Sequence, residues 1–193
     1  VIMNVQNGDL LAVASSPKYD PNMQDSPVSN NAFVNKAFSY YPPASIFKLV
    51  LATAALEEGI DLPTDFNCPG YYDMADGRRV KCWYEEGHGK EDLQLALMNS
   101  CNPYFVHLGA LLGGDKIKEY AEKFGLTQQQ IIGYPLEEET TIDFNSLVPG
   151  DVANVSIGEN GVNLSPVMIA QLIATIANGG QAVIPRVVQD IEQ

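Results

Sequence analysis

The sequence has few basic residues, no long hydrophobic run and only three cysteines. Eleven lysines and arginines stand against 24 aspartates and glutamates, which gives a formal net charge of −13. This charge excludes a generally basic nucleic-acid-binding surface, so no nucleic-acid partner is expected. The most apolar stretch, residues 168–177, is interrupted by Gln171 and is too short to cross a bilayer. Three cysteines alone do not indicate a redox compartment.

The remaining composition is that of a globular protein, with 46% hydrophobic and 18% charged residues among 193. A chain of this length can bury one sizeable core, so a single domain over residues 1–193 is expected. The sequence contains no internal repeat and no low-complexity tract.

The order of predicted elements indicates the fold class. Residues 1–5 and 10–15 are β-rich runs joined by Asn7-Gly8, a pair that favours a tight hairpin turn. A long surface connection is expected over 17–39, and residues 60–90 are rich in turn residues. The chain thus begins with a hairpin, continues with a mainly helical body and ends with an extended segment at 182–188. This order predicts an α+β fold, with helices packed on an antiparallel sheet. The predicted helices are 45–58, 92–98, 104–112, 115–123 and 165–178.

Ser45 and Lys48 form the first candidate catalytic pair. A serine hydroxyl is a weak nucleophile until a base accepts its proton. Residues three apart share one face of a helix, so the lysine amine can reach the serine oxygen. Burial beside Phe47 and Leu49 would lower the pKa of the lysine and favour its neutral form. The helix N-terminus would also favour a developing oxyanion. The alternative is a serine that only caps the helix.

Ser100 and Asn102 form the second candidate element, in a short turn between two predicted helices. Ser100 can relay a proton between Lys48 and a leaving amine, and the Asn102 amide can bond both the lysine and a substrate peptide group. The alternative is that these residues only cap the following helix. Ser-x-x-Lys followed by Ser-x-Asn, in this order, is typical of penicillin-binding proteins and class A β-lactamases.

Beyond these motifs, the sequence resembles class B penicillin-binding proteins over nearly its whole length. Cys68, Cys82 and the run Gly87-His88-Gly89 are similar to elongation-type and sporulation-type members. Two positions depart from the family pattern: Ala44 stands where glycine is common, and Glu159-Asn160 replaces the usual Gln-Gly. The resemblance is carried by residues 7–17, 19–22, 41–48, 68–70, 81–83, 87–89, 100–105, 156–161 and 176–180.

The resemblance implies a transpeptidase that cross-links peptidoglycan stem peptides and is acylated by β-lactams. Ser45 would be the acylated nucleophile, Lys48 its base, and Ser100 and Asn102 would fill the Ser-x-Asn roles. No cofactor is implied. The expected location is the extracytoplasmic face of the bacterial cell membrane, with the anchor not in this chain. Cell-wall synthesis proteins are expected partners.

Two other classes of function fit the same motifs. A β-lactamase or carboxypeptidase of the same superfamily would use the same serine, but deacylation by water needs a base over the acyl-enzyme, and no additional carboxylate motif is evident. A β-lactam-sensing domain would stay acylated without cross-linking. A catalytically inactive scaffold domain would not be acylated.

The spacing of the cysteines and histidines argues against a metal site. The spacing between Cys68 and Cys82 is longer than the close pairs usual in zinc sites, and Cys101 lies inside the second motif. A Cys68–Cys82 disulfide is the favoured alternative in an oxidising compartment, and ordinary buried thiols otherwise. His88 and His107 are interpreted as structural. A further set of aromatic residues either lines a groove or forms a core or surface cluster: Tyr71, Tyr72, Trp83 and Tyr84.

The third family motif, Lys-Thr-Gly or Lys-Ser-Gly, does not occur in the sequence. In the family it lies on a strand that lines the cleft, after the helical body. The predicted N-terminal hairpin also needs partner strands, because an isolated two-stranded hairpin is only marginally stable and exposes open edges. The expectation is therefore a C-terminally incomplete domain, whose partner is the missing segment of the same domain.

A mass measurement tests this expectation. We expect the purified, active protein to contain more polypeptide than these residues, because the missing strand would supply an oxyanion donor worth about 10²–10³ in rate. Intact-mass spectrometry combined with labelling by a fluorescent penicillin provides the measurement. A single 21.0 kDa species that is acylated at a normal rate would contradict the expectation.

Overall fold

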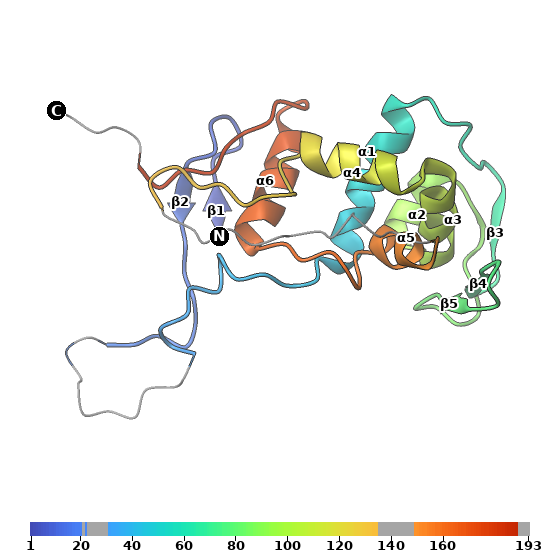
Figure 1. The fold of residues 1–193 in the computed structure, drawn as a ribbon, viewed down its shortest axis with the longest axis horizontal. Helices are drawn as coiled ribbons and strands as arrows, with labels where there is room; N and C mark the ends of the chain where they lie inside the picture. The colour runs from blue at the N-terminus through green and yellow to red at the C-terminus, as the bar shows by residue number, and fades with distance from the viewer. Residues whose placement is uncertain (21, 23–30, 135–148, 189–193) are drawn as a thin grey trace. The chain divides into compact units, whose positions relative to one another are not determined.

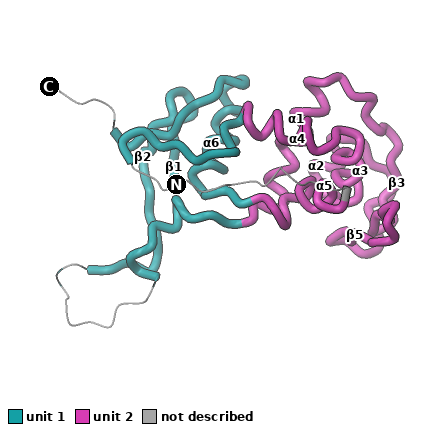
Figure 2. Tube along the Cα trace, viewed as in Figure 1, with its two compact units in different colours: residues 1–41, 124–141, 163–193 teal, residues 42–123, 142–162 magenta. Residues whose placement is uncertain are grey.

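A computed structural model describes residues 1–20, 22, 31–134 and 149–188, which contain helices and short antiparallel strands (Figure 1). These residues belong to two compact units (Figure 2). Unit 1 comprises Val1–Tyr41, Phe124–Thr141 and Asn163–Gln193, and unit 2 comprises Pro42–Lys123 and Ile142–Val162. The single domain over 1–193 stays a prediction, and part of the predicted connection 17–39 lies outside the described residues.

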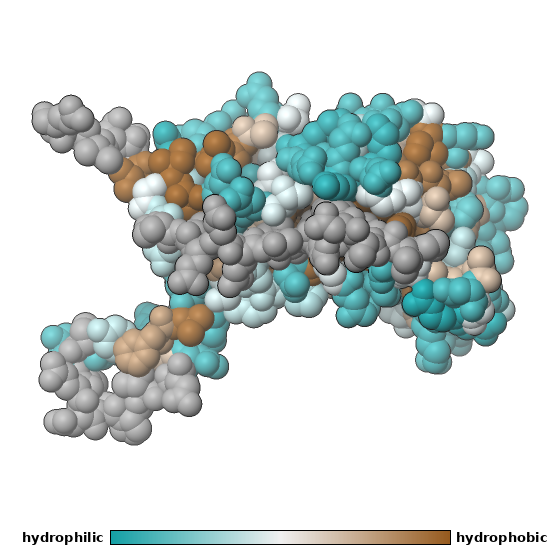
Figure 3. Space-filling model, in the orientation of Figure 1, coloured by the Kyte–Doolittle hydropathy of each residue, from teal (hydrophilic) through white to brown (hydrophobic). Residues whose placement is uncertain are grey.

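Unit 1 begins with the predicted hairpin. Strand β1 (Ile2–Met3) pairs antiparallel with β2 (Leu10–Ala12), and Gly8 takes a φ of 79° in the connection. Such a backbone conformation is open to glycine without steric cost. Ile2 and Leu11 on these strands are 60% and 64% exposed. Figure 3 shows that hydrophobic and hydrophilic residues are mixed on the visible face of the molecule. Among the described residues the hairpin pairs with no third strand.

Helix α6 (Pro166–Ala177) packs on strand β1 of the hairpin and contributes Val167 to the core of unit 1. Its N-terminus follows the prediction, because Ser165 Oγ accepts a hydrogen bond from the Met168 amide at 3.2 Å. The predicted extended segment 182–188 makes only isolated bridges, in which Arg186 meets Asp9 and Ile132. The core consists of Ala37, Ile131 and Val167, with Met3, Leu10, Val13 and Phe38 packed against it.

Unit 2 is built around two apolar helices. The predicted helix over 45–58 is divided into a 3-10 turn, η1 (Ala44–Phe47), and helix α1 (Lys48–Glu57). Helix α3 (Asn102–Leu112) contacts α1 and α2 (Leu93–Met98), and also α4 (Gly114–Lys123) and α5 (Pro149–Ser156). Because α3 lies among so many neighbours, its side chains are apolar on most sides.

Helix α5 was not among the predicted elements. It is short and begins with a proline and a glycine, which are poor helix formers inside a helix. Its position depends on close packing with α3, since a Cβ added at Gly109 would lie 1.8 Å from Ser156 Oγ. A tertiary contact, and not local propensity, accounts for this helix.

The turn-rich segment 60–90 contains four short strands that the sequence did not predict. Strand β3 (Phe66–Cys68) pairs antiparallel with β6 (Gly89–Glu91). Strand β4 (Tyr71–Asp73) pairs antiparallel with β5 (Arg79–Lys81). Together with the helices, these pairs confirm the α+β class. In the described part of the chain, no helix has the length and apolar character needed to cross a membrane.

Substitution of two glycines with positive φ tests the close contact between Gly158 and Ala44. Gly158 has a φ of 72°, and a Cβ there would lie 2.0 Å from the Ala44 carbonyl oxygen, whereas Gly77, with a φ of 83°, has open space. We expect Gly77→Ala to lower the free energy of unfolding by about 1–2 kcal/mol, through backbone strain alone. Gly158→Ala should lower it further, because Ala44 must also move.

Urea denaturation of the two variants measures this difference. Equal losses of free energy in Gly158→Ala and Gly77→Ala would contradict the close approach.

Candidate active site

The four predicted site residues meet in unit 2. Lys48 Nζ lies 3.1 Å from Ser45 Oγ and 3.1 Å from Ser100 Oγ, and Ser100 Oγ donates a hydrogen bond to Ser45 Oγ at 2.8 Å. Asn102 Oδ1 accepts from Lys48 Nζ at 2.7 Å. Ser45 comes from η1, Lys48 from the start of α1, Ser100 from the turn after α2 and Asn102 from the start of α3.

Ser45 is exposed at a strained turn. Ala44, the residue before it, has a φ of 48°, a conformation that favours glycine and is costly for other residues. The Ala44 amide donates to the Gly158 carbonyl at 3.0 Å, so the segment after α5 holds this turn in place. Ser45 itself lies in the first turn of η1, where backbone N–H groups have no acceptor in a preceding turn. This places the hydroxyl outward and the peptide N–H free to serve an oxyanion.

Lys48 is buried, with 1% of its surface exposed, and its amine has four acceptors within reach. The two shortest contacts are to oxygens that can only accept, the Ser100 carbonyl at 2.8 Å and Asn102 Oδ1 at 2.7 Å. The two hydroxyls lie farther away, at 3.1 Å. A neutral amine has two N–H groups for the first pair and one lone pair for a hydroxyl proton. The arrangement therefore suits the lysine as a base.

Burial lowers the pKa of Lys48 to about 8. The Phe105 ring lies 5.5 Å from the amine and takes the place of water around it. The Glu159 carboxylate acts in the opposite direction, toward a higher pKa. The net effect keeps a useful fraction of the amine neutral near physiological pH.

The turn that carries the second motif is held by residues 81–91, a contribution that the sequence did not reveal. Asn102 Nδ2 donates to the Lys81 carbonyl at 3.2 Å. Asn99, which precedes Ser100, is bound twice: Trp83 Nε1 donates to its carbonyl at 2.8 Å, and its side chain donates to Glu91 Oε1 at 2.6 Å. Two of these acceptors are backbone carbonyls, which every residue has. The amino-acid sequence therefore could not predict these two hydrogen bonds.

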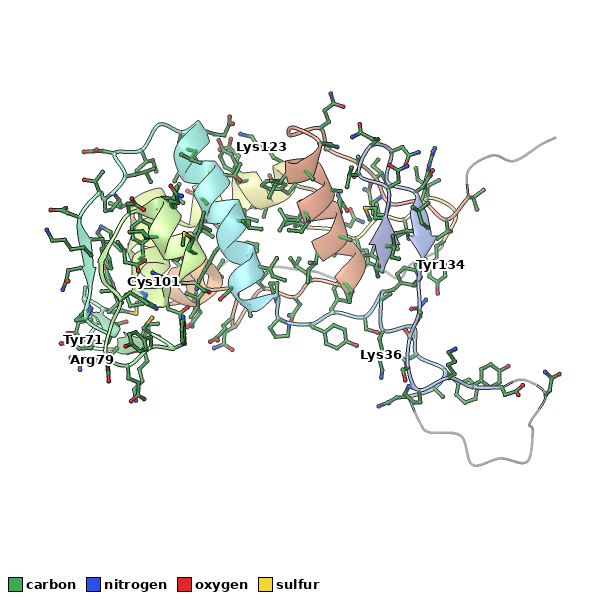
Figure 4. The ribbon with its side chains drawn as sticks, turned by 180° about the vertical axis from the view of Figure 1, so that it is seen from behind. Lys36, Tyr71, Arg79, Cys101, Lys123 and Tyr134 are labelled. Atoms are coloured by element: carbon green, nitrogen blue, oxygen red, sulfur yellow. The ribbon has the colours of Figure 1, made fainter. Side chains whose placement is uncertain are left out.

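Cys101, between the two motif residues, is completely buried. Burial raises the pKa of its thiol far above the ordinary value, so it stays protonated and is a poor nucleophile. Figure 4 shows Cys101 near the start of α3.

Three other residues with sulfur or imidazole side chains surround Cys101. The potential metal-ligating atoms of Cys68, Cys82, His88 and Cys101 all lie within 4.8 Å of one another. The spacing argument against a metal site therefore does not hold in space, because the short strands β3 to β6 fold the separate positions together. The three cysteines are free thiols in this structure, and no Cys68–Cys82 disulfide is formed.

The remaining predicted candidates lie around this group. His107 is beside Tyr72, with Tyr72 Oη and His107 Nδ1 3.4 Å apart, and burial lowers its pKa. Trp83 is 65% exposed, and its ring contacts the His88 ring at 5.4 Å between centroids. The Arg79 guanidinium stacks on the Tyr71 ring at 3.7 Å (Figure 4). These aromatic residues form surface and partly buried contacts, and Tyr71 lines a cavity of about 200 Å³ together with Gly70, Arg79, Lys81 and Glu85.

The site defines a class of protein. A serine hydroxyl bonded to a buried lysine of lowered pKa, with a second serine touching both, is the arrangement of a serine acyl-transfer site. The chain belongs to the penicillin-binding-protein transpeptidase family, because the family model for the penicillin binding protein transpeptidase domain matches residues 1–193.

Two curated relatives show the extent of the similarity. Stage V sporulation protein D of Bacillus subtilis is 33% identical over 98% of this chain and 30% of its own length. Peptidoglycan D,D-transpeptidase PbpA of Mycolicibacterium smegmatis is 33% identical over 100% of this chain and 43% of its own length. The chain thus spans well under half the length of these relatives.

The chain is also similar to solved structures of penicillin-binding proteins. An imipenem acyl-enzyme complex of penicillin-binding protein A from M. tuberculosis has a TM-score of 0.83 and 28% identity, over 95% of this chain and 46% of that one. A structure described as a peptidoglycan synthase complex that coordinates polymerization and crosslinking has a TM-score of 0.80 and 29% identity, over 97% of this chain and 36% of that one.

The lowered pKa of Lys48 predicts the pH dependence of acylation. Below about 8 the amine is protonated and cannot accept the Ser45 proton, so the acylation rate should fall by about tenfold per pH unit and level off above about 8. Glu159→Gln removes a charge that raises this pKa and should move the midpoint to lower pH.

Stopped-flow acylation by a fluorescent penicillin across this pH range provides the measurement. Glu57→Gln, at an exposed position on α1, is the matched control and should leave the midpoint unchanged. A pH-independent rate would contradict the role of Lys48 as the base.

Proposed function

We propose that the protein is a serine-type D-Ala-D-Ala transpeptidase, which cross-links peptidoglycan stem peptides through an acyl-enzyme at Ser45. The observation that carries this proposal is the contact of Ser45 Oγ with both Lys48 Nζ and Ser100 Oγ, at 3.1 and 2.8 Å. Family membership and the names of the relatives support the same reaction.

Acylation begins when Ser45 Oγ attacks the carbonyl carbon of the penultimate D-alanine. The Ser45 proton passes to the neutral Lys48 amine, whose two N–H groups stay bonded to the Ser100 carbonyl and Asn102 Oδ1. The peptide C–N bond then breaks. Ser100 Oγ, in contact with both Ser45 and Lys48, can pass a proton to the departing terminal D-alanine, whose nitrogen leaves as an amine.

The second half of the reaction runs the same groups in reverse. An amine from a neighbouring stem peptide attacks the acyl carbon and loses a proton toward Lys48. The ester bond to Ser45 breaks, and Ser45 Oγ takes back a proton. One peptide bond is broken and another is formed, so the reaction needs no cofactor.

A β-lactam would acylate the same serine by opening its ring amide. The similarity to an imipenem acyl-enzyme complex supports this extension. The Ser45 N–H supplies one oxyanion donor, and we assign the second to the Lys-Thr-Gly or Lys-Ser-Gly motif, which this sequence does not contain.

The substrate also indicates a location and partners. Peptidoglycan is assembled outside the cytoplasmic membrane, so we assign the domain to the extracytoplasmic side. Other cell-wall synthesis proteins are the expected partners, which the similarity to a chain of a peptidoglycan synthase complex supports. The net charge of −13 is consistent with the absence of a nucleic-acid partner.

Replacement of the nucleophile tests the proposal. Ser45→Ala in the full-length protein removes the only oxygen that can form the acyl-enzyme, so labelling by a fluorescent penicillin should be lost. Ser39→Ala, a serine whose hydroxyl donates to the Asn35 carbonyl in unit 1, is the matched control and should label like the parent protein. Labelling that survives in Ser45→Ala would show that the nucleophile is elsewhere.

Two further measurements separate the competing functions. Cross-linking of a lipid-linked stem-peptide substrate, followed by mass spectrometry of the product, distinguishes a transpeptidase from a sensor or a scaffold. Steady-state hydrolysis of a chromogenic cephalosporin would instead indicate a β-lactamase. Labelling without either turnover would identify a sensing domain and contradict the proposal.

A further inference from the structure

We propose that the outer face of the β4–β5 hairpin binds a carboxylate of the donor stem peptide through Lys81 and Arg79. The inference rests on the proposed function, because the donor is the peptide that acylates Ser45. It adds two specificity-determining residues beside the second motif, neither of which was a predicted site residue.

The two faces of this hairpin differ in character. Side chains alternate along a strand, so Tyr72 on β4 and Val80 on β5 share one face, and both pack against an apolar cluster that includes residues of α3 and α5. The opposite, outer face is therefore turned away from this cluster. The outer face carries two cross-strand pairs, Tyr71 with Lys81 and Asp73 with Arg79.

A cavity of about 200 Å³ lies on the outer face, lined by Gly70, Tyr71, Arg79, Lys81 and Glu85. The backbone closes it at one end: the Cys82 amide donates to the Gly70 carbonyl at 2.8 Å, and a Cβ at Gly70 would lie 2.1 Å from the Glu85 carbonyl oxygen. Since one water occupies about 30 Å³ in the liquid, the cavity has room for a carboxylate and a few adjoining groups, but not for a whole stem peptide.

The Arg79 guanidinium is fixed in place before any ligand binds. It stacks on the Tyr71 ring at 3.7 Å (Figure 4), and its Nε and Nη2 donate to the Asp73 carboxylate at 2.6 and 3.1 Å. Its Nη1 has no hydrogen-bond partner in the part of the chain that the structure describes. A preorganised N–H group loses little conformational freedom when it binds a ligand.

Lys81 supplies the uncompensated positive charge. Asp73 offsets the charge of Arg79, whereas the Lys81 ammonium forms no ion pair with any described residue. The lining therefore contains two cationic residues and one acidic residue, Glu85, in a chain whose net charge is −13. This local excess of positive charge favours an anionic group.

Short contacts join the cavity to the nucleophile. The Lys81 carbonyl accepts from Asn102 Nδ2 at 3.2 Å, Asn102 Oδ1 accepts from Lys48 Nζ at 2.7 Å, and Lys48 Nζ lies 3.1 Å from Ser45 Oγ. An extended peptide advances about 3.3–3.6 Å per residue, so a group about two residues ahead of the scissile bond can reach Lys81. In a stem peptide that group is the glutamate, which has a carboxylate outside the peptide linkage.

Peptide binding to the full-length Ser45→Ala protein tests the site, because this variant cannot be acylated and reports binding alone. Two synthetic stem peptides ending in D-Ala-D-Ala are compared, which differ only in a free glutamate carboxylate or its carboxamide. We expect the carboxylate peptide to bind about fivefold more tightly by isothermal titration calorimetry, the scale of a partly exposed charge pair. Added salt should reduce this preference.

Variants of Lys81 in the same Ser45→Ala protein identify the residue responsible. Lys81→Gln should reduce the preference to about onefold, and Lys81→Arg, which keeps the charge, should retain it. Both variants keep the backbone carbonyl that binds Asn102. Lys90→Gln is the matched control, because Lys90 is an exposed lysine on β6 outside the cavity lining, and it should retain the preference.

Three results of these titrations would overturn the proposal. The first is the absence of a preference in the Ser45→Ala protein, whether both peptides bind equally or neither binds. The second is a preference that survives in Lys81→Gln. The third is an equal loss in Lys81→Gln and Lys90→Gln, which would show a long-range effect of charge and not a contact in the cavity.

The same two peptides without the terminal D-Ala-D-Ala separate the donor from other sources of a carboxylate. They keep the glutamate group but lose the residues that place it relative to position 45. We expect their preference to fall to about onefold, since the register is lost. An undiminished preference would show that the cavity serves the acceptor peptide or a free anion, and would overturn the assignment to the donor.

Cross-linking by the unmutated protein keeps this inference distinguishable from the proposed function. We expect the carboxylate donor to be used about fivefold better in kcat/KM. Equal use of the two donors would contradict the cavity and leave the transpeptidase function intact. A carboxylate preference in binding, without cross-linking of either donor, would contradict the transpeptidase function and support the cavity.

Discussion

Burial of the Lys48 amine is the constraint on which the rest of unit 2 depends. An ammonium group removed from water is costly, and the neutral form is favoured, which is the form that a base requires. The cost is limited by two carbonyl-type acceptors at 2.7 and 2.8 Å, one from Asn102 and one from Ser100. Every element that positions these acceptors therefore shapes the candidate site as well as the packing.

Two segments that lie far from the motifs in sequence hold the turns around Lys48 in place. The Gly158 carbonyl accepts a hydrogen bond from the strained Ala44 turn before Ser45, and the approach is close enough that only glycine fits there. On the other side, Lys81 and Trp83 bind the residues around Ser100. The site is thus held by the segment after α5 and by residues 81–83 in and after β5, none of which belongs to the two motifs.

The sequence predicted much of the fold. The helices that begin after Asp92 and Ser165 are confirmed close to their predicted bounds, because capping is a local effect. The hairpin is confirmed as well, but its strands are shorter than the predicted 1–5 and 10–15. Helix α5 and strands β3 to β6 were missed, because their short segments have weak propensity and are stabilised by partners distant in sequence. The helix over 45–58 also begins differently, with Ser45 in a 3-10 turn.

The sequence by itself determined the candidate chemical groups: a serine, a lysine three residues later, and a second serine and an asparagine that can hydrogen-bond to the lysine. It also supplied three cysteines and a histidine, whose spacing along the chain argued against a common site. Only the tertiary structure decided that Lys48 is buried, that residues 48 and 100 touch, and that the four sulfur and nitrogen ligands converge. The physical reason is that burial and proximity come from contacts between distant segments, which local sequence patterns do not encode.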